Sequence, residues 1–192
     1  MTDRVSSLVQ RIRDLQAELE EEFDRRRATF KYTVDQHRVV FEKEAKERQR
    51  ALRQTITSYL AEARPMVVLT APVIYSVIVP LVLLDLFVTL YQAICFPVYR
   101  IEKVRRADYI SLDRRHLAYL NGLEKLNCMY CGYGNGLLAY AGEISARTEA
   151  HWCPIKHAAR MKRTHEHYPE FADYGDAEGF RRKKQELHEA TK

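Results

Sequence analysis

The feature that most constrains this chain is an apolar run from Met66 to Val98, in which Asp85 is the only charged residue. A helix needs about 20 apolar residues to cross the hydrocarbon core of a bilayer. Soluble cores seldom contain a run of this length without Lys or Arg, although a buried helical pair in a soluble oligomer is the alternative. We therefore predict a membrane anchor over residues 65–99 of a mainly α-helical protein.

Two arrangements of the anchor fit its length, which exceeds one straight crossing and falls short of two. One is a helical hairpin that bends near Pro80, and the other is a single tilted span built mainly from residues 74–98. A basic flank marks the cytoplasmic side of a membrane segment. Four basic residues follow this run: Arg100, Lys103, Arg105 and Arg106. The hairpin is our prediction, because it leaves both ends of the chain in the cytoplasm, at the cell (inner) membrane.

Asp85 is a candidate functional residue, since an acid at membrane depth usually faces a protein partner, a water-filled cavity or a headgroup. A position near the apex of a hairpin is the structural explanation for the same residue.

Residues 1–64 are predicted to form one long charged helix, because Thr2 to Ala63 contain neither proline nor glycine. The spacing of apolar residues in this segment alternates between three and four, which is typical of a coiled coil. These residues are Val5, Leu8, Ile12, Leu15 and Leu19. The stripe resumes, after a stutter near Phe23, as far as Leu60 and includes His37, interpreted as a packed histidine. It needs a partner, either a second copy of the chain or the C-terminal domain.

The remaining chain is divided into a small helical Cys/His domain over residues 100–168 and a polar tail over residues 169–192. We predict a helix capped by Asp113, a glycine-rich loop at residues 128–136, and a helix over residues 137–151. A third helix is predicted from Pro154 to about Arg163. The end of the tail is predicted to be a short helix or to fray.

Cys128, Cys131, Cys153 and His157 form the spacing Cys-x-x-Cys, then Cys-x-x-x-His. Thiolates and imidazole are zinc ligands, and three thiolates with one imidazole complete a tetrahedral site. The sequence predicts a structural zinc site, with iron as the alternative metal and thiols without metal as a further alternative. Cys95 is interpreted as a buried membrane cysteine or a palmitoylation site, with the fourth ligand position, in place of His157, as its alternative role. The other candidate imidazoles are His116, His151, His165 and His167.

The Cys-x-x-Cys-Gly-Tyr segment resembles the knuckle of rubredoxins and zinc ribbons, with Cys153-Pro154 similar to the second knuckle. That resemblance implies a metal held by the cysteines. The segments LLDLFVTLYQAICFPVYR, LNCMYCGYGNG and WCPIKHA resemble a family of uncharacterised bacterial membrane-associated proteins. The second resemblance implies membrane association and no particular activity.

The net charge of +5 arises from 31 basic and 26 acidic residues that alternate along the chain. This pattern favours an anionic lipid surface over nucleic acid as the partner.

The sequence contains no phosphate-binding glycine loop, nucleophile elbow or zinc-protease helix. We therefore predict a non-enzymatic, membrane-anchored adaptor or scaffold that pairs with itself or with another membrane or cytoplasmic protein. The alternatives are a redox or electron-transfer protein and an accessory subunit of a membrane complex.

Overall fold

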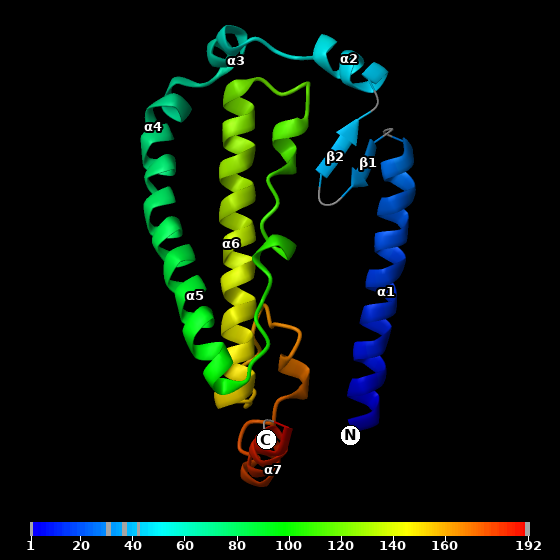
Figure 1. The fold of residues 1–192 in the computed structure, drawn as a ribbon, viewed down its shortest axis with the longest axis vertical. Coiled ribbons are helices and arrows are strands. Elements are labelled where there is room, and N and C mark those ends of the chain that lie inside the picture. The colour runs from blue at the N-terminus through cyan, green and yellow to red at the C-terminus, as the bar shows by residue number, and fades with distance from the viewer. Residues whose placement is uncertain (1, 30–31, 36–37, 42, 191–192) are drawn as a thin grey trace. The chain divides into compact units, whose positions relative to one another are not determined.

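A computed structural model describes residues 2–29, 32–35, 38–41 and 43–190 (Figure 1). These residues are mainly α-helical, as predicted. The chain forms two compact units, which we call unit 1 (Met1–Tyr75 with Leu112–Gly132) and unit 2 (Ser76–Ser111 with Tyr133–Lys192). Both units are therefore assembled from segments that lie far apart in the sequence.

Unit 1 begins with helix α1, Thr2–Thr29, and continues into an antiparallel hairpin of strands β1, Tyr32–Asp35, and β2, Arg38–Phe41. Helices α2, Lys43–Ala51, and α3, Ile56–Glu62, follow. The prediction of one helix over residues 1–64 is therefore wrong. The strand segments Tyr-Thr-Val and Val-Val-Phe consist of β-branched and aromatic residues, whose strand preference outweighs the absence of helix breakers. Phe30 and His37 lie outside the described residues.

The predicted apolar stripe is present on α1, and no described part of unit 1 covers it. Its residues Val5, Leu8, Ile12, Leu15 and Leu19 are each about half exposed. A solitary polar helix gains little from such a stripe in water, so α1 still requires a partner.

The apolar run is one long helix, Pro65–Tyr99, and not the hairpin that we predicted. It consists of α4, Pro65–Ser76, and α5, Ile78–Tyr99, separated only by Val77. Val77 keeps a right-handed helical backbone, and its carbonyl accepts a hydrogen bond from Leu81 N. Pro80 lies in the first turn of α5, where no N–H partner within the helix is required, so it does not reverse the chain.

Unit 2 contains α5, a return segment over residues 100–111, and the second half of α6, Gly122–Trp152. Arg100, with φ of 55°, ends α5 in a left-handed conformation, after which the return segment runs back along α5. Within this unit α5 and α6 lie side by side (Figure 1). The core between them is apolar and centres on Phe96, Val104, Leu137, Tyr140 and Ile144.

Two short 3-10 helices, Arg106–Asp108 in unit 2 and Asp113–His116 (η2) in unit 1, precede α6. The helix expected to start at Asp113 instead starts at Gly122. Asn121 Oδ1 accepts a hydrogen bond from Glu124 N at 3.0 Å, while Glu124 Oε2 accepts one from Asn121 N at 2.8 Å. This reciprocal capping box is the stronger start signal.

The predicted loop at residues 128–136 is also wrong, because α6 is helical throughout it, whereas the helix predicted over residues 137–151 is confirmed. One of the glycines in this segment, Gly136, is required by close packing. A Cβ on Gly136 would lie 2.5 Å from Tyr109 O and 2.9 Å from Ile110 Cα. The return segment approaches α6 so closely at Gly136 that only glycine fits, and this contact outweighs the low helix propensity of glycine.

After α6, residues 153–163 form no helix, contrary to the prediction. Ala172 N donates to Pro154 O at 2.9 Å, and Lys156 N donates to Ala172 O at 2.8 Å, so this backbone pairs in an extended form. A 3-10 turn, Tyr168–Glu170, and helix α7, Ala177–Ala190, complete unit 2. The short C-terminal helix was one of the two predicted alternatives.

The packing at Gly136 generates a matched test. Gly136→Ala should destabilise unit 2 by about 1–3 kcal/mol, because the added methyl group meets backbone that must shift. Gly142→Ala, on the same helix with no atom within 4 Å of the new Cβ, should stabilise it by about 0.5–1 kcal/mol. Denaturant unfolding in mild detergent, followed by fluorescence of Trp152, the one tryptophan of the chain, measures both. Equal effects of the two substitutions would contradict the packing role of Gly136.

Candidate functional site

Asp85 of α5 joins three segments of unit 2 through one carboxylate. Arg106, in the return segment, donates from Nη2 to Oδ2 at 2.6 Å and from Nε to Oδ1 at 3.2 Å. Tyr133 of α6 donates from Oη to Oδ2 at 3.0 Å, and Thr89 donates to Oδ1 at 3.3 Å. The acid thus faces protein partners, which is one of the environments predicted for it.

A second polar contact lies two helical turns further along α5. Gln92 Oε1 accepts from Val104 N at 3.0 Å, and Gln92 Nε2 donates to Val104 O at 3.3 Å and to the hydroxyl of Tyr140. Gln92 is only 6% exposed, and these bonds satisfy its amide and the backbone of Val104 together.

The two contacts repeat one arrangement. Asp85 and Gln92 are seven residues apart on α5, and Tyr133 and Tyr140 are seven apart on α6, so each pair lies on one face of its helix. Each layer joins α5, the return segment and α6, and the layers are about 10 Å apart along the helices. Gly136 lies between them on α6, where the return segment approaches most closely.

The local electrostatics favour the charged ion pair in the layer that contains Asp85 and Arg106. The hydrogen bond to Asp85 raises the pKa of Arg106 above its ordinary value, despite partial burial. Burial, followed by the hydrogen bond to Asp85, raises the pKa of the Tyr133 hydroxyl, so Tyr133 remains a donor at neutral pH. The cluster is therefore an ion pair supported by further hydrogen bonds from Tyr133 and Thr89.

The predicted metal ligands are not brought together. Cys128 and Cys131 lie one turn apart in the part of α6 that belongs to unit 1, whereas Cys153 and His157 follow α6 in unit 2. The residues between Cys131 and Cys153 are helical throughout, and roughly 20 helical residues extend about 30 Å.

Across the described ranges 2–29, 32–35, 38–41 and 43–190, no group of three or more His, Cys, Asp and Glu side chains is arranged to hold a metal ion. None of the four cysteines forms a disulfide, and Cys95, on α5, is half-buried. His157 is exposed and stacks on Tyr168. The zinc site, and iron as its alternative, remain predictions from the sequence.

Two further histidines that were candidate ligands contact carboxylates of α6. His165 Nε2 lies 2.9 Å from Glu149 Oε2, and His167 Nε2 lies 3.4 Å from Glu143 Oε1. Burial raises the pKa of Glu143, but hydrogen bonds from Arg147 and His167 outweigh it and hold this pKa below its usual range. These pairs fasten residues 165–167 to α6.

No family model, curated protein or solved structure matched the chain. The resemblances noted in the sequence therefore remain predictions.

The sequence singled out Asp85 but missed its partners. Arg106 was interpreted as one of several membrane-flanking cations, and Tyr133 as part of a metal knuckle. The recurrence of polar side chains at seven-residue spacing in an otherwise apolar helix, at Asp85 and Gln92, was the available signal.

A double-mutant cycle tests the ion pair between Asp85 and Arg106. Asp85→Asn and Arg106→Gln should each destabilise unit 2 by about 1–3 kcal/mol, since each leaves the other partner unsatisfied. Their effects should be non-additive by about 1 kcal/mol or more. Unfolding midpoints of the four proteins measure the coupling energy.

The control is the pair Arg105–Asp108, whose side chains are 82% and 41% exposed and 3.0 Å apart. The same cycle with Arg105→Gln and Asp108→Asn should give a coupling energy of less than about 0.5 kcal/mol. Equal coupling in the two cycles would contradict the special role of Asp85.

Proposed function

We propose that the protein is a non-enzymatic membrane adaptor, which attaches to lipid through the exposed face of α5 and presents α1 to a protein partner. The observation that carries this proposal is the uneven covering of α5. Half-buried and buried residues recur on one face, whereas the rest of the helix surface is apolar and exposed, including Leu83, Leu86, Phe87, Leu90 and Ile94. The most apolar 18-residue window of the long helix contains no buried residue.

The return segment favours a helix that lies in the membrane interface over one that crosses the bilayer. At 22 residues, α5 is about 33 Å long, close to the thickness of the hydrocarbon core. If α5 crossed, Asp85 would lie within that core and bring Arg106 with it, together with the exposed pair Arg105–Asp108. Each charge near the bilayer centre costs about 2.5–3.5 kcal/mol or more. An interfacial position places only the apolar face in lipid.

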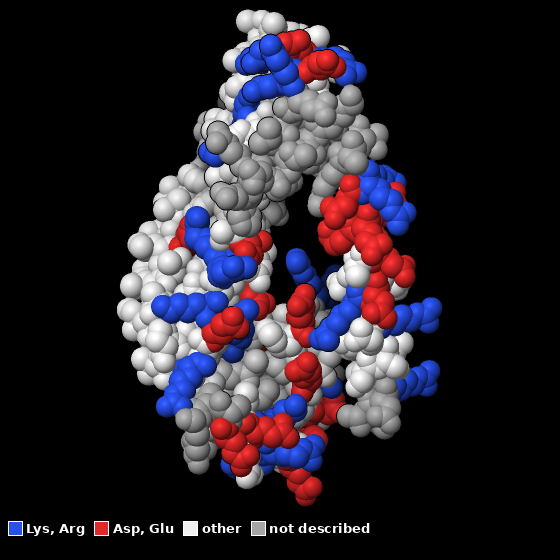
Figure 2. Space-filling view, turned by 45° about the vertical axis from the view of Figure 1, so that its right-hand side comes forward, with Lys and Arg blue, Asp and Glu red and all other residues white. Residues whose placement is uncertain are grey.

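Basic residues of the return segment support the same orientation. Arg100, Lys103 and Arg105 are exposed and follow directly on α5. Anionic headgroups attract such residues by about 1 kcal/mol each near the surface. On the face drawn in Figure 2, basic and acidic side chains are otherwise intermingled, without the broad basic surface of a nucleic-acid-binding protein.

The adaptor role requires a second attachment, for which we propose the exposed stripe of α1. Its spacing is that of a coiled coil, so a second copy of the chain is the proposed partner. An interfacial helix leaves both units on one side of the membrane, and the basic flank makes the cytoplasmic side of the cell membrane the proposed location.

The two attachments should be separable by mutation. Leu86→Lys/Leu90→Lys adds two charges to the exposed face of α5, and co-flotation with phosphatidylcholine vesicles should fall at least about tenfold. Leu8→Lys/Leu15→Lys changes two leucines of similar exposure on α1. This control should keep flotation and lose self-association, measured by light scattering in mild detergent. An α5 variant that floats like the unchanged chain would contradict lipid attachment through this face.

The side of the membrane on which each unit is accessible distinguishes an interfacial helix from one that crosses the bilayer. In a cysteine-free background, a single cysteine is placed at Ser7 in α1 or retained at the exposed Cys153 in unit 2. With the protein added to sealed vesicles, a membrane-impermeant maleimide should label both positions to the same extent, because neither crosses the bilayer. Labelling of one position only, with the other requiring detergent, would show a crossing helix and overturn the interfacial arrangement.

A further inference from the structure

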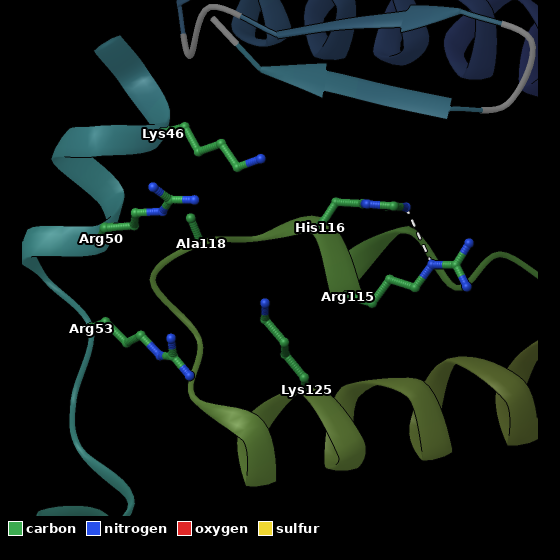
Figure 3. A pocket seen from close by; sticks show the side chains of 7 residues that line it. All are labelled: Lys46, Arg50, Arg53, Arg115, His116, Ala118 and Lys125. Carbon is green, nitrogen blue, oxygen red and sulfur yellow. Dashed lines mark hydrogen bonds between the residues drawn. The ribbon is translucent and has the colours of Figure 1, made fainter. Parts of the chain in front are cut away.

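Unit 1 contains a strongly basic pocket of about 290 Å³. Three segments form its lining: α2 with Arg53, two residues beyond its end, the η2 segment with Ala118, and the first turn of α6. In Figure 3 the charged ends of Lys46, Arg50, Arg53 and Lys125 extend into one shared space, with Arg115 and His116 opposite α2. Ala118 completes the lining, which contains no acidic residue.

The pocket carries a positive charge that its own lining does not neutralise. Among the residues that the structure describes, no ion pair joins any of its five Lys and Arg side chains to a carboxylate. Arg115 Nε donates to His116 Nε2 at 3.2 Å, within the lining itself. The nearby acid Glu124 is engaged in the capping box of α6.

This arrangement works against the stability of unit 1. Lys46 and Arg50 are four residues apart on one face of α2, where like charges repel. Lys125 lies in the first turn of α6, where the helix dipole disfavours a cation. A bound anion would offset both effects, and the positive end of the 31-residue helix α6 would add to its attraction.

We propose that this pocket binds a phosphate-bearing anion with at least two negative charges. Guanidinium groups match phosphate oxygens in two-point hydrogen bonds, and Arg50 and Arg53 extend theirs into the space that Lys46 and Lys125 share (Figure 3). Its volume is at the lower end of the range for small-molecule sites, which suits a phosphorylated headgroup or a small phosphorylated molecule. The lining contains no Phe, Tyr or Trp on which a nucleic-acid base would stack.

Two sources supply this chemistry, the headgroup of an anionic phospholipid and a soluble phosphate compound. The first probe is inorganic pyrophosphate, titrated calorimetrically into the full chain in neutral detergent. The second is flotation with phosphatidylcholine vesicles that contain phosphatidic acid, compared with pure phosphatidylcholine vesicles.

The pocket variant Arg50→Gln/Arg53→Gln removes two exposed arginines, so the fold should persist, which helix content by circular dichroism checks. The control Arg11→Gln/Arg13→Gln removes the same charge from exposed positions on α1. The pocket variant should weaken pyrophosphate binding, or the preference for phosphatidic acid, at least about tenfold, and the control less than about twofold. A charge-conserving variant, Arg50→Lys/Arg53→Lys, should retain part of the affinity.

The outcome identifies the source. Loss of pyrophosphate binding assigns a soluble phosphate ligand, whereas loss of the phosphatidic acid preference alone assigns a lipid headgroup. Flotation with pure phosphatidylcholine tests only the α5 attachment, and the pocket variant should leave it unchanged. The proposal is overturned if neither probe binds saturably, if the two variants lose equal affinity, or if a single-stranded RNA oligomer binds the pocket in preference to pyrophosphate.

Discussion

One carboxylate holds unit 2 together, and the placement of its other parts follows from it. Asp85 lies in an apolar helix, where an unpartnered acid would be costly, and four hydrogen bonds from Arg106, Tyr133 and Thr89 satisfy its two oxygens. Because Arg106 follows α5 in sequence, the pair requires the chain to turn back at Arg100 and run along the helix it has just left. Gln92 fastens the same return segment at Val104. The close approach of that segment to α6 then requires glycine at position 136.

The contacts of Asp85 and Gln92 also explain why α5, an apolar helix of spanning length, is covered along one face only. The polar side chains of α5 and the apolar residues between them contact the return segment and α6. The charges of the return segment are thereby held beside the middle of α5, and this proximity is the physical reason for proposing an interfacial anchor. Unit 2 is amphipathic as a whole, because the few polar side chains of α5 face the return segment and α6 while its opposite face is apolar and exposed.

Much of the helical character was predictable from local patterns, and the errors arose where tertiary contacts outweighed them. The apolar run, the helix over residues 137–151 and the α1 stripe follow from composition and periodicity. The glycines near residue 134 indicated a loop by propensity, but the close packing of Gly136 depends on a return segment that no local window contains. Cys-x-x-Cys is equally compatible with a metal knuckle and with two successive turns of a helix. The helical conformation of the residues between Cys131 and Cys153 places these two cysteines far apart along α6. The spacing of the cysteines in the sequence does not reveal this conformation.

The three features left unsatisfied by the fold differ in chemistry, and the difference indicates what each requires. The exposed face of α5 is broad and aliphatic, which suits lipid chains. The stripe on α1 is narrow and has heptad spacing between charged flanks, which suits another helix. The pocket of unit 1 combines five cations without an acid, which suits phosphate. A stable domain with no partner would be expected to bury the first two and to neutralise the third, because each lowers stability or solubility while vacant. Their coexistence in one chain therefore supports the proposal that the protein attaches to several partners.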